Sequence, residues 1–370
     1  MMNHPRLISL DVFRGITVAL MILVNSPGNQ TAYPLLSHSA WDGCTLADLV
    51  FPFFIFILGV SIAFTLTNAR AKMVPDRQLF IKIIQRACIL FFIGVLLNAF
   101  PYHFHFATIR VYGVLQRIAI CYFFASLFFL TTSITTQAII ALILLLGYHL
   151  LMMPFALTQD GNFAAYLDRQ IFSSAHLYGK TFDPEGFLST FPAIATALLG
   201  NLTGGWLLSS YNHKQKFAAI SSAGIFACLL GWLWGLWFPI NKSLWTSSYV
   251  LWTGGIAVIC LASCYWLIEM KDWRKWSTSF EVFGVNALLA YILHVVFLKI
   301  QAIISIPRVD GSQGNLRLFI TEHLFNWTSL QNASLLYACS YTLFWLVFIH
   351  WHQSIKRRSP STIQKPARLK

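Results

Sequence analysis

Residues 46–67 read LADLVFPFFIFILGVSIAFTLT, a run with one charged side chain, Asp48. A helix of about 20 apolar residues crosses the hydrocarbon layer of a bilayer. Nine further runs are bounded by polar or Gly/Pro-rich stretches. The ten runs are approximately residues 7–26, 45–67, 82–100, 111–131, 136–155, 187–209, 217–238, 247–268, 279–301 and 333–352. Their near-continuous hydrophobicity predicts an all-α polytopic membrane protein, a bundle of about ten transmembrane helices, and not a membrane barrel.

The composition agrees with this fold class. Hydrophobic residues make up 57% of the chain and charged residues 11%, whereas soluble domains carry about 25% charged residues. The net charge of +13 comes from basic residues in short loops, where they control topology, so no nucleic-acid partner is expected. The seven cysteines contain no CxxC pair, which predicts neither a disulfide framework nor a metal site. The first run lacks the AxA-like end that is typical of a cleavable signal peptide, so none is expected.

Lysines and arginines outside the apolar runs set the expected orientation. With the N-terminus in the cytoplasm, sixteen lie on the cytoplasmic side and six on the outer side, as the positive-inside rule requires. We therefore expect an inner-membrane protein with both termini in the cytoplasm. It would comprise a transmembrane domain at 1–352 and a basic cytoplasmic tail at 353–370. The longest loops, and hence the expected site, face outward.

Ionisable side chains inside a membrane are costly and commonly functional. Asp11 and Arg14 are three residues apart and lie on one helix face. They could form a structural ion pair, or Arg14 could hold a phosphorylated donor at the cytoplasmic end of the bundle. Asp48 needs a partner or a wet cavity, and His38, ten residues earlier, is a candidate. An imidazole tuned by a carboxylate can act as an acid, a base or a nucleophile. The alternative is a solvated loop histidine.

Other polar or aromatic side chains interrupt the runs or stand at their ends. They are Asn25, Trp41, Gln116, Arg117, Asp183, Glu185, Asn286 and His294. Individually, the amides and Arg117 could hold helices together by hydrogen bonds. Together, these residues predict a polar cavity inside the bundle.

Six motifs lie between residues 9 and 294: SLDVFRG, SHSAWDGCTLADLVFPFFIFILGVS, GVLQRIA, FDPEGFLST, NKSLWTSSY and GVNALLAYILH. This combination resembles the heparan-α-glucosaminide N-acetyltransferase family, in a bacterial form. SLDVFRG alone is shared more widely among membrane acyltransferases. The resemblance implies transfer of acetyl from cytosolic acetyl-CoA to the amine of a terminal glucosamine across the membrane.

The resemblance also implies roles for individual residues. His38 matches the family's proposed catalytic histidine, Asp48 the carboxylate that follows it, and Asn25 an upstream asparagine. His38 would remove the amine proton or carry the acetyl group itself, Asp48 would orient the ring, and Asn25 would steady the thioester oxygen. Donor binding is expected at Arg14, Gln116 and Arg117. Acceptor binding is expected at Trp41, Asp183, Glu185, Asn286 and His294.

Two rival functions remain open from the sequence. An O- or N-acyltransferase of envelope polysaccharide or peptidoglycan fragments would use the same donor chemistry. A transporter for a sugar or organic anion would also contain buried Asp, Arg and His residues, although no inverted-repeat signal is found. The expected partners are an amino-sugar or glycan acceptor and the lipid bilayer, with a homodimer left open.

Overall fold

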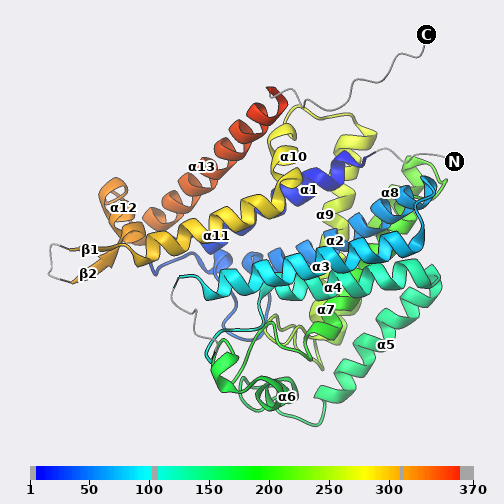
Figure 1. The fold of residues 1–370 in the computed structure, drawn as a ribbon, viewed down its shortest axis with the longest axis horizontal. Helices are drawn as coiled ribbons and strands as arrows, with labels where there is room; N and C mark the ends of the chain where they lie inside the picture. The colour runs from blue at the N-terminus through cyan, green and yellow to red at the C-terminus, as the bar shows by residue number, and fades with distance from the viewer. Residues whose placement is uncertain (1–5, 102–106, 309–311, 359–370) are drawn as a thin grey trace.

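The computed structural model describes residues 6–101, 107–308 and 312–358. Figure 1 shows long helices packed alongside one another, with one short antiparallel pair of strands, β1 (Ser305–Pro307) and β2 (Gln313–Asn315). The start of α1 and the end of α13 lie toward the same end of the bundle, as an even number of crossings requires. Of the predicted tail, 353–358 continues helix α13, and 359–370 lies outside the described residues.

The long helices coincide with the predicted apolar runs. They are α1 (Ile8–Asn25), α2 (Leu46–Ala71), α3 (Asp76–Ala99), α4 (Val114–Thr131), α5 (Ile134–Met152), α7 (Thr190–Leu207), α8 (His213–Trp234), α9 (Ser247–Tyr265), α11 (Ala287–Ile303) and α13 (Leu330–Arg358). Shorter elements are η1 (Pro34–Leu36), α6 (Phe163–Phe172), η2 (Ser174–His176), η3 (Trp266–Met270), α10 (Thr278–Val285) and α12 (Leu316–Leu324).

Eight helices in the described part of the chain are long and apolar enough to cross a membrane. The count is nine if α10 and α11, bent by 79° at Asn286, form one broken span. Helix α7 fills the predicted run 187–209 but is not among the eight, because polar residues such as Asn201 and Thr203, together with Pro192, lower its mean hydropathy. Most of its residues are buried in the bundle. The predicted all-α polytopic fold is confirmed.

The lipid-facing surface is apolar. Helix α8 exposes Phe226, Leu229 and Trp232, each more than half accessible. Helix α5 exposes Leu142 and Ile143 in the same way. Exposed apolar surface on this scale is typical of a face that contacts lipid, which explains why these helices bury few residues.

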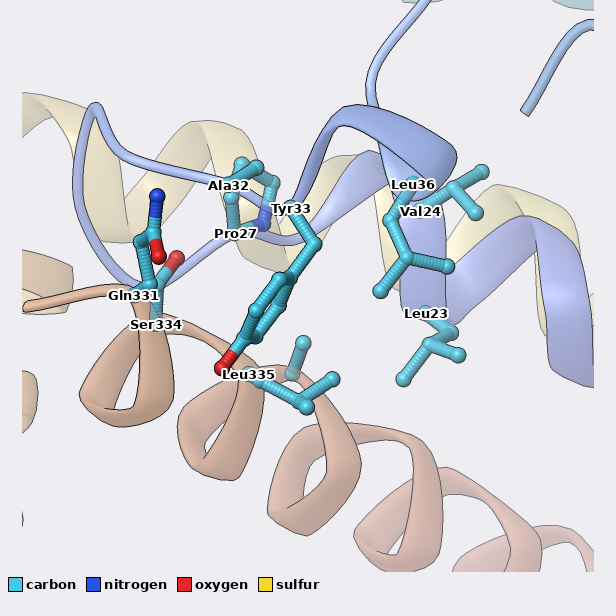
Figure 2. Close-up of a pocket in the computed structure, with 10 residues that line it drawn as sticks. Leu23, Val24, Pro27, Ala32, Tyr33, Leu36, Gln331, Ser334 and Leu335 are labelled. Carbon is cyan, nitrogen blue, oxygen red and sulfur yellow. The ribbon is translucent and has the colours of Figure 1, made fainter. Parts of the chain in front are cut away.

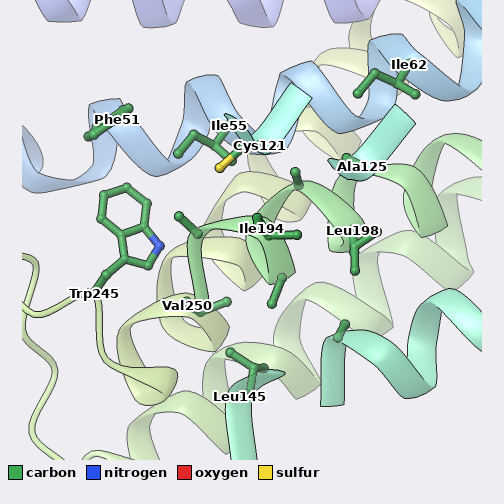
Figure 3. Close-up of a cluster of buried hydrophobic side chains, with 14 of the residues drawn as sticks. Phe51, Ile55, Ile62, Cys121, Ala125, Leu145, Ile194, Leu198, Trp245 and Val250 are labelled. Atoms are coloured by element: carbon green, nitrogen blue, oxygen red, sulfur yellow. The ribbon is translucent and has the colours of Figure 1, made fainter. Parts of the chain in front are cut away.

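Helices α2 and α7 cross at glycine residues. A Cβ atom on Gly59 would lie 2.0 Å from the carbonyl oxygen of Ala197, and one on Gly200 would lie 2.1 Å from that of Phe56. Small residues allow this close approach, which supplies van der Waals contact where lipid provides no hydrophobic drive. Figure 3 shows the adjoining core, in which side chains of α2 and α7 meet those of α4, α5 and α9.

Loops at one end of the bundle are joined to one another. The Trp41 indole donates to the Leu157 carbonyl oxygen over 2.8 Å. The Gly43 backbone N–H donates to the Ile240 carbonyl oxygen over 2.7 Å. These bonds connect the loop before α2 to the loop between α5 and α6 and to the loop before α9.

Replacing Gly200 with valine should force α2 and α7 apart, because the new side chain would overlap the Phe56 carbonyl. We expect the free energy of unfolding to fall by about 1–3 kcal/mol or more, measured as a lower thermal midpoint in detergent. Gly147→Val on α5 is the control, because a Cβ there meets nothing within 4 Å. An unchanged midpoint for Gly200→Val would contradict the close crossing.

Candidate functional site

Asp48 is fully buried in the first turn of α2 and is the centre of the candidate site. Its Oδ2 accepts from the backbone N–H groups of Ser39 and Thr45, each over 3.0 Å. Thr45 is the N-cap of the helix, and it forms a capping box with Asp48. Local sequence chemistry therefore places the carboxylate, since Thr-x-x-Asp is a helix-start pattern.

His38 contacts the other oxygen of this carboxylate. Its Nδ1 lies 2.8 Å from Asp48 Oδ1, and its side chain is half exposed. An ionised carboxylate only accepts hydrogen bonds, so we assign the proton to Nδ1, which leaves the lone pair on Nε2. The predicted pairing of His38 with Asp48 is present, in a form that suits a base or a nucleophile.

Lys242 completes this cluster and is not among the site residues predicted from the sequence. Its Nζ lies 2.9 Å from His38 Nδ1, 3.3 Å from His38 Nε2 and 3.4 Å from Asp48 Oδ1. Burial lowers the pKa of Lys242 below the usual lysine value, while Asp48 and Glu185 act in the opposite direction. The available signal was that Lys242 is the one charged residue in segment 235–246.

The loop that carries Lys242 is fixed to the loop that carries His38. Asn241 is buried, and its side-chain amide donates to Asp42 Oδ1 over 3.1 Å. The Asn241 Oδ1 accepts from the backbone N–H of Leu244 over 2.8 Å. Gly43 has a φ of +107°, a left-handed conformation that suits glycine. The hydrogen bonds of the Asn241 side chain thus fix the loop that carries Lys242, and they do not depend on the charge of the lysine.

Trp41 joins the His38 loop to the segment before α7. Its ring packs edge-on against Phe182 with 5.6 Å between centroids, and its N–H bonds to Leu157. The indole donor is therefore already used within the protein.

Asp183 and Glu185 both pair with Arg110. The Arg110 guanidinium binds Asp183 through two hydrogen bonds of 2.9 and 2.6 Å, and it also contacts the Glu185 carboxylate. Asp183 accepts in addition from the backbone N–H groups of Tyr178 and Glu185. Four donors occupy its two oxygens, so Asp183 shapes the loop, and Glu185 is the less constrained carboxylate of the pair.

Arg117 and Gln116 present unpartnered polar atoms inside the protein. Arg117 is fully buried, and one terminal nitrogen donates to Ser189 and, over 3.3 Å, to the Gly186 carbonyl. Its Nε and Nη1, and both side-chain polar atoms of Gln116, have no partner among the described residues. A buried guanidinium is costly without partners, so this position suits a bound polar group or water.

Arg14 does not lie beside Arg117. Arg14 pairs with Asp11 over 2.8 Å, as predicted, and donates to Ser61 Oγ over 2.7 Å. Arg117 stacks 5.0 Å over the ring of Trp245, which packs on Phe51. Ser61 follows Phe51 by ten residues on α2, or about 15 Å along the helix axis. The predicted donor residues therefore occupy two separate levels of the bundle.

Comparisons with known proteins support one family. A model of the heparan-alpha-glucosaminide N-acetyltransferase catalytic region matches residues 6–235. The heparan-alpha-glucosaminide N-acetyltransferases of Homo sapiens and Mus musculus are each 30% identical to the chain. Each alignment covers 79% of this chain and 53% of the relative. The chain belongs to the heparan-alpha-glucosaminide N-acetyltransferase family. It spans about half the length of these two relatives.

The family match contains most of the candidate site. The matched range 6–235 includes His38, Asp48 and Arg117 and ends before Lys242. Lys242 lies in the NKSLWTSSY motif at 241–249, but only the tertiary structure shows that its ammonium group lies beside His38 and Asp48.

The structure places three other predicted residues apart from the His38 cluster. Asn25 is exposed at the end of α1 and has no recorded contact with His38 or Asp48 among the described residues. Asn286 lies at the α10–α11 break and donates to the Gln353 side chain over 3.1 Å. His294 is buried on α11, and its Nδ1 has no described partner. Their predicted roles stay predictions.

Figure 2 shows how the loop after Asn25 packs. Pro27, Tyr33 and Leu36 face α13 across a crevice of about 20 Å³, with Ser334 and Leu335 on the opposite side. The Tyr33 hydroxyl bonds to Asn332 of α13. This volume holds about one water molecule, so the crevice is a packing contact between the loop and α13.

Asp168 on α6 is another buried carboxyl group outside the predicted set. Its Oδ1 accepts from the Phe187 backbone N–H over 2.8 Å, and its Oδ2 has no described partner. Burial raises the pKa of Asp168 to about 7. The signal in the sequence was its helical spacing from Ala164 and Ala165, which places it on the buried face. Within the described residues, no group of three or more His, Cys, Asp or Glu could hold a metal.

Replacing Arg110 with glutamine should destabilise the loop before α7, because Asp183 is fully buried and would lose its cation. Removing one partner of a buried pair costs about 3–5 kcal/mol, and we expect the lower part of that range. Arg308→Gln is the control, since its pair with Glu322 is over a third exposed on both sides and should contribute at most about 1 kcal/mol. Equal changes in thermal midpoint would contradict this difference.

Proposed function

We propose that this protein is a transmembrane N-acetyltransferase. It would move acetyl from cytoplasmic acetyl-CoA to the amine of glucosamine, or of a glucosamine-containing glycan, on the outer side. The observation that carries the proposal is the 2.8 Å contact between His38 Nδ1 and the buried Asp48 carboxylate. Family membership supports the choice of acetyl transfer, because both relatives named above are N-acetyltransferases.

The chemistry follows from the tautomer of His38. With Nδ1 donating to Asp48, Nε2 carries a lone pair. In one route Nε2 removes the proton of the acceptor amine as the nitrogen attacks the thioester carbon. In the other, Nε2 attacks that carbon and the carbon–sulfur bond breaks. The amine then attacks the acetyl-imidazole, the bond from the acetyl carbon to Nε2 breaks, and Nε2 takes up the amine proton. In both routes the CoA sulfur leaves as a thiolate that takes up a proton.

The donor would extend between the two levels of the bundle. CoA carries several negative charges, so its nucleotide would stay at the basic cytoplasmic side, where Arg14 lies. The thioester end would reach toward the unpartnered donors of Gln116 and Arg117. The separation of about 15 Å between these levels along α2 suits a long, flexible donor arm.

The acceptor would bind where the outer-side loops meet. Trp41 offers a ring face, and Glu185 offers a carboxylate near Lys242 that could bind the amino group of the sugar. The distribution of basic residues in the sequence supports cytoplasmic termini and an inner-membrane location. The bilayer then separates the donor and acceptor sides, with His38 at the outer side.

His38→Ala should abolish acetyl transfer, with a loss of at least about 10²-fold to 10⁴-fold in kcat, because acid–base catalysis contributes that much. The measurement is acetylated product from labelled acetyl-CoA and a panel of amino sugars and glycans, using folded purified protein. His323→Ala is the control, since His323 is exposed on α12. Full turnover by His38→Ala would remove His38 from the mechanism.

The two routes differ in what happens without an acceptor. If His38 carries the acetyl group, incubation with labelled acetyl-CoA alone should leave label on the protein, and His38→Ala should not be labelled. Kinetics would then be ping-pong. Sequential kinetics with no trapped label would exclude the acetyl-imidazole and leave His38 as the base.

A further inference from the structure

We infer that Lys242 is a catalytic residue, whose ammonium group stabilises the negative charge that develops on the acetyl carbonyl oxygen during transfer. This inference rests on the proposed function and adds a third residue to it. It derives from the position of Nζ beside the reacting nitrogen of His38.

The hydrogen-bonding capacity of the three groups limits how they can be arranged. An ammonium group only donates, and an ionised carboxylate only accepts. If Nδ1 lacked a proton, its lone pair would face Asp48 Oδ1 at 2.8 Å, which is repulsive. With the proton on Nδ1, Lys242 cannot donate to that nitrogen. Its available partners are Asp48 Oδ1 at 3.4 Å and His38 Nε2 at 3.3 Å.

This arrangement puts a positive charge next to Nε2, where both routes place the reacting carbonyl. Attack on the thioester moves an electron pair onto the carbonyl oxygen, and collapse of the adduct expels the thiolate. A donor fixed beside that oxygen lowers the barrier without reorganisation, and removing one such donor commonly costs about 10²-fold to 10³-fold in kcat. The role is the same whether Nε2 is the base or the nucleophile.

Other cations near the site are committed elsewhere. Arg110 is held by Asp183 and Glu185. Arg117 stacks on Trp245 and donates to Ser189. Its partners among the described residues do not include His38. Among the described residues, Lys242 is the cation recorded in contact with the His38 ring.

The backbone around Lys242 is fixed before any substrate binds. The Asn241 backbone N–H donates to Thr246 Oγ1 over 3.1 Å, and Trp245 adopts a φ of +53°. Lys242 is itself only 20% exposed. A charge that is held in place and shielded from water acts more strongly than a mobile surface lysine.

The test uses Lys242→Met, which keeps most of the side-chain length and removes the charge. We expect kcat to fall about 10²-fold to 10³-fold, with KM for acetyl-CoA and for the amino sugar changed by less than threefold. Lys180→Met is the matched control, because Lys180 is exposed on the outer loop before α7. It should retain wild-type kcat.

Lys242→Arg separates charge from packing. Arginine keeps its proton at all accessible pH values, so this variant should be more active than Lys242→Met. The groups facing the ammonium are Asp48 on α2, His38 and Cys44 on the loop before α2, and Glu185. Because burial lowers the Lys242 pKa, wild-type kcat should decline at a pH below the usual lysine range, and Lys242→Arg should move that decline upward. A purely structural lysine would not move it.

The outcomes distinguish this inference from the proposed function. Wild-type transfer, an inactive His38→Ala and a Lys242→Met variant within threefold of wild type would overturn the role of Lys242 alone. A folded Lys242→Arg variant as inactive as Lys242→Met, with no change in pH profile, would also overturn it. Should Lys242→Met fail to fold, the activity and pH profile of Lys242→Arg decide the question. A wild-type protein that acetylates no amino sugar would overturn both proposals.

Discussion

The buried carboxylate of Asp48 is the group on which the loops at this end of the bundle depend. A carboxylate without donors in an apolar environment is costly or becomes protonated. Asp48 meets this requirement with two backbone N–H groups, the imidazole of His38 and the ammonium of Lys242. These donors come from two segments almost 200 residues apart in sequence, so satisfying one carboxylate fixes both loops against the start of α2.

The membrane environment explains why the helices are held together by close packing and by individual hydrogen bonds. Lipid is as apolar as the helix surfaces, so helices associate through close packing and interhelical hydrogen bonds. The α2–α7 crossing at Gly59 and Gly200 is an example of the first. The bond from Asn201 to the Ala125 carbonyl oxygen, 2.9 Å long, is an example of the second. This rigid centre supports the loops that carry His38 and Lys242.

Charged groups in the bundle divide into two kinds. Arg110 with Asp183, and Arg14 with Asp11, satisfy one another and hold segments in place. Arg117 is fully buried yet keeps two nitrogens unpartnered among the described residues. A protein tolerates such incomplete pairing at sites where a ligand supplies the missing interaction. This contrast separates Arg117 from the paired arginines of the bundle.

The sequence by itself determined the fold class and the local chemistry of the His38–Asp48 pair. The lengths of the hydrophobic runs set the helices, and the capping box of Thr45 and Asp48 sets the carboxylate ten residues after His38, because both depend on neighbours in the chain. Tertiary structure decided what depends on distant segments. In the folded protein Lys242 contacts His38, and Asp183 pairs with Arg110. Arg14 and Arg117 lie at different levels of the bundle. Run length and motif spacing carry no information on which loops meet, because helix packing and hydrogen bonds between loops determine those contacts.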